Sequence, residues 1–147
     1  MATVISKSPE ETFALGELWG REARRGWVIG LSGDLGAGKT QLVKGLARGL
    51  GSTARVHSPT FALLNEYAGG REPLFHLDLY RLNDANEVLG AGLEEYLINP
   101  AGVAVVEWVE RWQPVAPGQN TRLITRLVWI ETLGETERNI TYEDSGA

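Results

Sequence analysis

Residues 33–40 read Gly33-Asp34-Leu35-Gly36-Ala37-Gly38-Lys39-Thr40, and this one segment determines the architecture that we predict. It matches G-x-x-x-x-G-K-[ST] at every fixed position. At average amino-acid usage, a chance match somewhere in the chain has a probability on the order of half a percent. The segment follows the strand-like apolar run 27–31 and precedes a helix-prone stretch over 39–48, which is the order that a phosphate-binding loop requires.

Each residue type in this segment has a chemical reason to be there. The glycines let the backbone turn tightly, so that consecutive N–H groups face an anion, and the following helix directs the positive end of its dipole at the same point. Lys39 is expected to reach the β- and γ-phosphates of a nucleotide, and Thr40 to offer its hydroxyl to Mg²⁺. The competing interpretation is a glycine-rich turn with a solvated lysine. The predicted nucleotide contacts are Gly33, Asp34, Leu35, Gly36, Ala37, Gly38, Lys39, Thr40 and Gln41.

A second contact to the metal is predicted at the end of a neighbouring strand. Residues 103–106 form an apolar run typical of a buried parallel strand, and Glu107 follows them. Parallel strands end at the same edge of a sheet, so Glu107 should lie near the loop after Leu31. The alternative is a glutamate that simply leaves the strand into solvent. The indole of Trp108 either covers an adenine base or packs in the core with Trp112.

Another candidate acid lies in the alternating segment 76–81, His-Leu-Asp-Leu-Tyr-Arg. On a strand, Asp78 shares one face with His76, while apolar residues take the other face. By itself the alternation is typical of a half-solvated strand, but beside a phosphate-binding loop Asp78 becomes a candidate to bind the metal or to orient the attacking water. Thr60 lies in the predicted loop between the helix after the phosphate-binding loop and the next strand, where a residue that senses the γ-phosphate usually lies, and it is our candidate for that role. The alternative is a plain turn built on Pro59.

The remaining pattern predicts an α/β fold of one domain over residues 1–147. We expect a P-loop NTPase-like three-layer sandwich, with a mostly parallel sheet and antiparallel strands at its edge or C-terminus. Residues 8–11, Ser-Pro-Glu-Glu, have the form of a capping box. The other expected elements are a helix from this box to about Gly26, paired strands over 61–67 and 74–80, a helix-prone region over 83–97 and a hairpin over 123–133 and 138–142.

Composition excludes several classes of function. The chain has no cysteine, so disulfide scaffolds, thiolate metal sites and cysteine nucleophiles are ruled out. Its 14 lysine and arginine residues stand against 19 acids, a net charge of −5, which argues against binding nucleic acid over the whole surface. No apolar run is long enough to span a membrane and the N-terminus lacks the apolar region of a signal peptide. We therefore expect a cytoplasmic protein that binds neither DNA nor membranes.

Four motifs, in this order, resemble the TsaE family, also called YjeE, the bacterial P-loop ATPases of tRNA threonylcarbamoyladenosine synthesis. They are G-D-L-G-A-G-K-T at 33–40, S-P-T-F at 58–61, H-L-D-L-Y-R at 76–81 and V-E-W at 106–108. The predicted N-terminal helix and C-terminal hairpin also fit, so the resemblance covers nearly the whole chain. Four ordered motifs are far more specific than the phosphate-binding loop alone.

The resemblance implies a role for each matching residue. Lys39 and Thr40 would bind ATP and Mg²⁺, Glu107 would be a magnesium ligand, and Trp108 would lie at the nucleotide base. Asp78 and Thr60 would be important for activity. Family members also touch the nucleotide through an N-terminal threonine and an arginine near the C-terminal hairpin, to which Thr12 and Arg138 are the nearest matches.

The resemblance also implies partners. The family acts with a TsaB–TsaD pair that modifies adenosine 37 of tRNAs reading codons that begin with A, and this chain would add ATP binding and hydrolysis. It would meet tRNA only through that complex. Because no arginine finger is evident in the sequence, turnover by the chain alone should be slow.

Three other functions share the same loop. A small-molecule kinase would need an acceptor pocket and an arginine-rich lid, for which 147 residues leave little space. A GTPase would need a guanine motif N-K-x-D, which the sequence lacks. A nucleotide-gated adaptor would bind partners in an ATP-dependent way without releasing phosphate.

Overall fold

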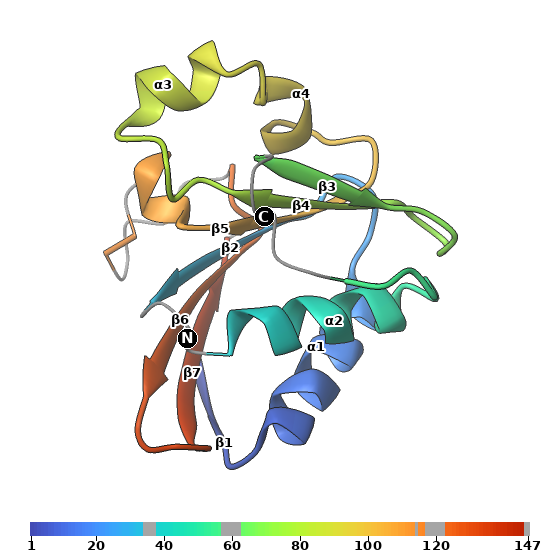
Figure 1. Ribbon diagram of the computed structural model, residues 1–147, viewed down its shortest axis with the longest axis vertical. Helices are drawn as coiled ribbons and strands as arrows, with labels where there is room; N and C mark the ends of the chain where they lie inside the picture. The colour runs from blue at the N-terminus through green and yellow to red at the C-terminus, as the bar shows by residue number, and fades with distance from the viewer. Residues whose placement is uncertain (34–37, 57–62, 114, 117–122, 146–147) are drawn as a thin grey trace.

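One seven-stranded sheet organises the part of the chain that the structure, a computed structural model, describes: residues 1–33, 38–56, 63–113, 115–116 and 123–145. The strands lie in the order β1-β7-β6-β2-β5-β4-β3 (Figure 1). β6, β2, β5 and β4 are parallel, whereas β7, β1 and β3 pair antiparallel at the two sides, as predicted. The strands are β1 (Ala2–Ser6), β2 (Val28–Gly33), β3 (Leu64–Tyr67), β4 (Leu74–Asp78), β5 (Val103–Glu107), β6 (Arg126–Thr132) and β7 (Arg138–Asp144).

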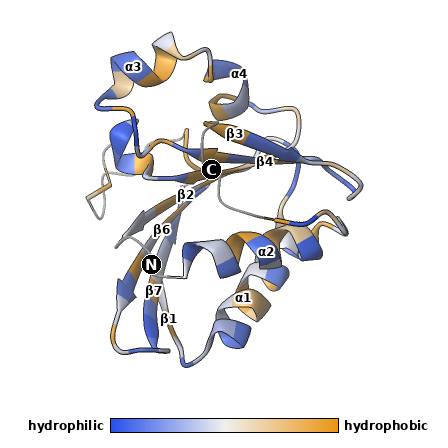
Figure 2. Ribbon diagram, viewed as in Figure 1, coloured by the Kyte–Doolittle hydropathy of each residue, from blue (hydrophilic) through white to orange (hydrophobic). Residues whose placement is uncertain are grey.

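Helices cover both faces of this sheet, which makes the fold a three-layer sandwich (Figures 1 and 2). α1 (Pro9–Glu22) and α2 (Lys39–Gly49) pack on one face. α3 (Ala85–Gly90), α4 (Glu94–Leu97) and the 3-10 helix η1 (Val109–Arg111) lie over the other. No helix in the described ranges has the length and apolar character needed to cross a membrane.

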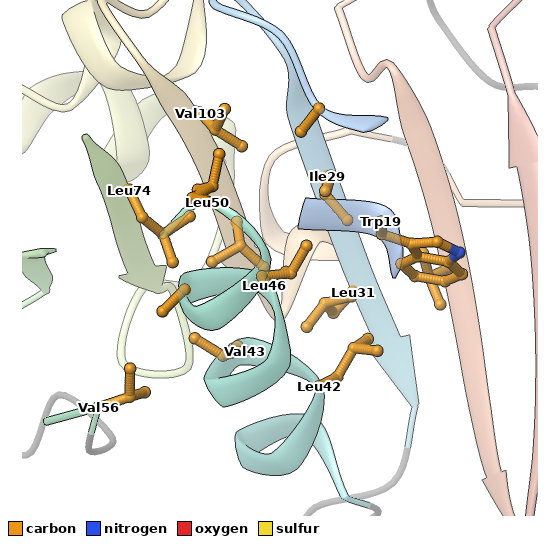
Figure 3. Packing of buried hydrophobic residues seen from close by; sticks show 14 of the residues in the cluster. Trp19, Ile29, Leu31, Leu42, Val43, Leu46, Leu50, Val56, Leu74 and Val103 are labelled. Carbon is orange, nitrogen blue, oxygen red and sulfur yellow. The ribbon is translucent and has the colours of Figure 1, made fainter. Parts of the chain in front are cut away.

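The central strands are buried on both faces, which explains their continuous apolar runs. Side chains alternate along a strand, so Ile29 and Leu31 of β2 enter the core beneath α1 and α2. Figure 3 shows these two residues facing Leu42 and Leu46 of α2. Val28, the alternate residue of the same strand, enters the second core.

Glycines set the distance between α1 and α2. Gly16 and Gly20 of α1 lie against Gly45 and Gly49 of α2, so that the two backbones are in direct contact. A methyl group at Gly45 would overlap the carbonyl oxygen of Phe13. This close packing fixes α1 beside the helix that follows the phosphate-binding loop. Sequence analysis did not predict it.

Most predicted elements are present, with local differences. β1 was not predicted: it is a five-residue edge strand, formed by pairing with β7. The helix-prone region 83–97 contains two short helices, which are separated by a turn at Gly92, where φ is +76°. The predicted strand over 74–80 ends at Asp78. The predicted capping box does open α1: Ser8 Oγ accepts a hydrogen bond from the Glu11 N–H at 3.1 Å.

Candidate functional site

Strand register brings the candidate residues to one edge of the sheet. β4, β5 and β2 are parallel neighbours, in which Asp78 pairs with Glu107 and Glu107 pairs with Leu31. The carboxyl ends of β2, β5 and β4 therefore lie side by side at this edge, as predicted from the rule for parallel strands. α2 begins at Lys39 and completes this edge.

Lys39 is the most unusual residue at this edge. Its side chain is only 3% exposed, and its Nζ atom has no hydrogen-bond partner in the described part of the chain. The ammonium group lies 4.7 Å from the centre of the Trp108 ring and makes a cation–π contact with it. Burying an unpaired charge is costly, and an anion with several oxygens would relieve that cost. The structure therefore fits a phosphate at Lys39.

The two described glycines of the loop are required by their conformations. Gly33 has φ +144°, and a Cβ atom there would overlap the carbonyl oxygen of Ile130. Gly38, which precedes α2, has φ +93°. Both values are rare for residues with side chains. The remaining loop residues predicted to contact nucleotide, Asp34, Leu35, Gly36 and Ala37, lie outside the described residues.

Thr12 and Arg138 both lie beside Gly38. A Cβ atom at Gly38 would be 3.9 Å from Thr12 Cγ2 and 3.8 Å from Arg138 Nε. Together with Gln41 they line a hollow of about 40 Å³. Thr12 is held by a 2.7 Å hydrogen bond between its hydroxyl and that of Ser6. The structure thus brings three sequence-predicted residues to the start of α2, although they come from α1, α2 and β7.

Glu107 is buried and oriented by a histidine. Its Oε2 atom lies 2.6 Å from Nε2 of His76, which is fully buried, so the alternative of a solvated glutamate is wrong. Nδ1 of His76 lies 3.5 Å from the hydroxyl of Tyr67. Sequence analysis placed His76 on the same face as Asp78 but assigned it no role. The alternating pattern of 76–81 was the available signal.

Asp78 lies half-buried in this same group of charges. Burial raises the pKa of its carboxyl above the ordinary value, and the negative charge of Glu107 acts in the same direction. A hydrogen bond of 3.0 Å from the Tyr80 N–H and the positive charge of Lys39 oppose that rise in pKa. Two carboxylates that repel each other favour a shared cation.

The donor set at this edge fits Mg²⁺ by its chemistry. The hydroxyl of Thr40 and the carboxylates of Asp78 and Glu107 supply only oxygen, the element that Mg²⁺ prefers. Within the described ranges no group of three or more His, Cys, Asp or Glu side chains could hold a metal. Mg²⁺ at phosphate sites is usually held by one or two carboxylates together with substrate oxygens.

Trp108 lies beside Lys39. Its backbone is left-handed, with φ +59°, and its ring is 5.0 Å from that of Tyr80. The ring also packs against the second core, which contains Trp112. Contact with a nucleotide base therefore stays a prediction for Trp108. Thr60, the predicted γ-phosphate sensor, lies outside the described residues.

A further contact near the loop was not predicted. Ser32, the residue before Gly33, donates a 3.1 Å hydrogen bond from its hydroxyl to Oε2 of Glu110 on η1. The neighbouring Arg111 lies 5.3 Å from the centre of the Trp108 ring. η1 therefore fixes both the start of the loop and the indole above Lys39. No local sequence motif signals these contacts, because they depend on how β5 continues into η1.

Comparison with known proteins places the chain in a family. Residues 6–140 match the family model of TsaE, the threonylcarbamoyl adenosine biosynthesis protein. The TsaE protein of Bacillus subtilis is 42% identical over 139 residues, 95% of this chain and 83% of that protein. The TsaE protein of Aquifex aeolicus is 41% identical over 141 residues, covering 93% and 92% of the two chains. Both are described as tRNA threonylcarbamoyladenosine biosynthesis proteins.

A solved structure agrees with these sequence matches. The crystal structure of YdiB from Bacillus subtilis superposes with a TM-score of 0.73 and 35% identity, over 99% of this chain and 86% of that one. The fold is thus the predicted P-loop NTPase-like α/β sandwich. The chain belongs to the TsaE family of threonylcarbamoyl adenosine biosynthesis proteins.

Proposed function

We propose that this protein binds and hydrolyses ATP as an accessory protein in the threonylcarbamoyl modification of adenosine 37 in tRNAs that read ANN codons. The observation that carries the proposal is the buried Nζ atom of Lys39, which has no hydrogen-bond partner in the described part of the chain. It lies at the N-terminus of an 11-residue helix, where backbone N–H groups and the helix dipole favour an anion.

Different residues of the site would contact different parts of a bound triphosphate. Lys39 and the N–H groups at the start of α2 would hold phosphate oxygens, while Thr12, Gln41 and Arg138 line the adjoining hollow. Thr40, Glu107 and Asp78 would hold Mg²⁺. Bound there, Mg²⁺ would neutralise charge on the phosphates. The hydrogen bond from His76 keeps the Glu107 carboxylate in a fixed position.

Hydrolysis needs a water molecule placed in line with the γ-phosphate. Asp78 or Thr60 would orient that water, and Lys39 would stabilise the charge that develops on the phosphate. Most of the catalysis would be positioning and electrostatic stabilisation, with little covalent chemistry for the protein. We expect slow turnover by the chain alone and faster turnover when TsaD and TsaB type proteins are bound.

The test is release of phosphate from ATP with Mg²⁺, measured with and without a TsaB–TsaD pair and tRNA. Lys39→Ala should abolish phosphate release. The control Lys7→Ala replaces an exposed lysine outside the site and should not change phosphate release. Unaltered phosphate release by Lys39→Ala would contradict the proposal. GTP tested in parallel distinguishes a GTPase.

The same assay distinguishes the other functions that use this loop. A phosphorylated small product in place of free phosphate would indicate a kinase. ATP-dependent binding to the pair with no phosphate release under any condition would indicate an adaptor.

A further inference from the structure

A second, larger hollow lies on α2 beyond the candidate nucleotide site. Its volume is about 290 Å³, and it lies between α2 and the segment 52–56. Its apolar lining comes from Phe13, Ala47 and Val56. The volume is close to the lower end of the range of about 300–1,000 Å³ for ligand pockets. It can admit one or two side chains of another protein.

Three cationic side chains and no carboxylate line this hollow. They are Lys44 and Arg48 of α2 and Arg55 of the adjoining segment. None of the three forms an ion pair or a hydrogen bond through its side chain with another residue of the described ranges. By contrast, Arg25 pairs with the carboxylate of Glu72 in its own chain. Three cations that line one hollow and have no partner among the described residues, in a protein of net charge −5, indicate an anionic occupant.

The charge and the apolar lining of the hollow favour a protein segment over a nucleic acid as its occupant. RNA binding relies on phosphates spread along a strand, and a chain with 19 acids repels such a polyanion over much of its surface. A single carboxylate requires only local charge, because salt screens the more distant acids. The buried side chains of Ala47 and Val56 offer apolar contact next to that charge. An Asp or Glu side chain beside an apolar one matches both features.

We propose that this hollow is a docking site for an acidic segment of a protein partner. The proposal rests on the proposed function in one respect, namely that the partner is the TsaB–TsaD type pair. Lys44 lies one helical turn after Thr40, so the docked segment would contact the same helix that begins at the nucleotide site. Segment 52–56 leads directly into residues 57–60, which contain Thr60. Docking would therefore take place on the helix that begins at the candidate nucleotide site, and on a segment that precedes Thr60 in the sequence.

The test reverses two charges in the hollow and compares them with a matched pair elsewhere. Arg48→Glu with Arg55→Glu changes the net charge as much as the control, Lys7→Glu with Arg24→Glu, whose exposed side chains do not line the hollow. Affinity for a purified TsaB–TsaD pair is measured with ATP and Mg²⁺. We expect the reversal in the hollow to weaken binding about tenfold or more, and the control to change it less than about twofold.

Two further measurements show that the hollow variant is intact. Its affinity for ATP alone should equal that of the natural chain, because none of the changed residues belongs to the nucleotide site. Its melting temperature should fall only slightly, since Arg48 lies in the last turn of α2, where a glutamate interacts unfavourably with the helix dipole. Arg48→Gln with Arg55→Gln is the second variant if charge reversal prevents folding. It should weaken binding in the same direction and reduce the sensitivity of binding to added salt.

Each other outcome has a definite meaning. If the natural chain binds the pair and neither hollow variant weakens that binding, the docking inference is wrong and the proposed function stands. If the natural chain does not bind the pair at all, the proposed partnership fails and the docking inference fails with it. If the variants instead lose affinity for isolated tRNA, the hollow is a site for RNA phosphates and the inference is overturned.

Discussion

The Glu107 carboxylate is held by a chain of buried contacts that begins at Tyr67 and passes through His76. A residue that orients a metal ligand typically changes metal affinity by about 10–100-fold when it is lost. We expect His76→Gln to raise the Mg²⁺ concentration needed for phosphate release within that range. ATP affinity measured in EDTA should not change.

Tyr67→Phe is the graded control for this prediction. It removes only the hydroxyl that lies 3.5 Å from His76 and leaves the 2.6 Å contact to Glu107. Its effect on the Mg²⁺ requirement should be smaller. An unchanged Mg²⁺ requirement in His76→Gln would show that Glu107 needs no orienting partner.

Asp78 gives the site a pH-dependent stability. Because burial raises its pKa in the folded state, folding favours the protonated carboxyl. The stabilisation from that proton is complete below the pKa of the unfolded chain and is lost as pH rises through the folded-state pKa. In EDTA, Asp78→Asn should therefore melt at a higher temperature than the natural chain at neutral pH, while losing phosphate release. The difference in melting temperature should shrink as the pH approaches 4. A neutral-pH melting temperature below that of the natural chain would contradict this account.

Lys39, Asp78 and Glu107 could be predicted as candidate site residues because each lies in a motif or at a strand end, and those positions follow from the sequence itself. The contact between His76 and Glu107 could not be predicted, because it depends on the register of β4 against β5. Thr12 and Arg138 were named through resemblance alone. Their common position beside Gly38 depends on the packing of α1 and on the C-terminal hairpin.

The glycine contact between α1 and α2 controls the position of α2, the helix that we propose to bind phosphate. A methyl group at Gly45 would overlap backbone rather than a flexible side chain, so the helices would have to separate. Overpacking of this kind costs about 1–3 kcal/mol. We expect Gly45→Ala to lower the free energy of unfolding by that amount, measured by urea denaturation.

Gly90→Ala is the matched control, because Gly90 ends α3 and has nothing within 4 Å of its added methyl group. Replacing a helical glycine by alanine at an open position is neutral or stabilises by up to about 1 kcal/mol. Equal stability of Gly45→Ala and Gly90→Ala would mean that the helices do not need this close approach. The paired glycines were visible in the sequence, but their meaning depends on which two helices meet.

Nucleotide binding should stabilise the molecule as a whole. A ligand that binds only the folded state stabilises it by about 2.7 kcal/mol at one hundred times its dissociation constant. We expect ATP with Mg²⁺ to raise the melting temperature of the natural chain and not that of Lys39→Ala. The control Lys7→Ala should show the full increase. An equal rise in Lys39→Ala would place the nucleotide elsewhere.

The order of layers and the parallel centre of the sheet were predictable because the phosphate-binding loop specifies a strand, a turn and a helix in that order. The outer strands were harder to predict. β1 has only five residues and becomes a strand by pairing with β7 from the other end of the chain. The second hollow had no sequence signal, since its three cations converge only after folding.

The most direct test of the central claim is a crystal structure with Mg²⁺ and a non-hydrolysable ATP analogue. The account predicts β- and γ-phosphate oxygens within hydrogen-bond distance of Lys39 Nζ, and a metal ion held by Thr40 and Glu107. A bound analogue that leaves Lys39 without a phosphate contact, or a metal ion held away from Glu107, would contradict it.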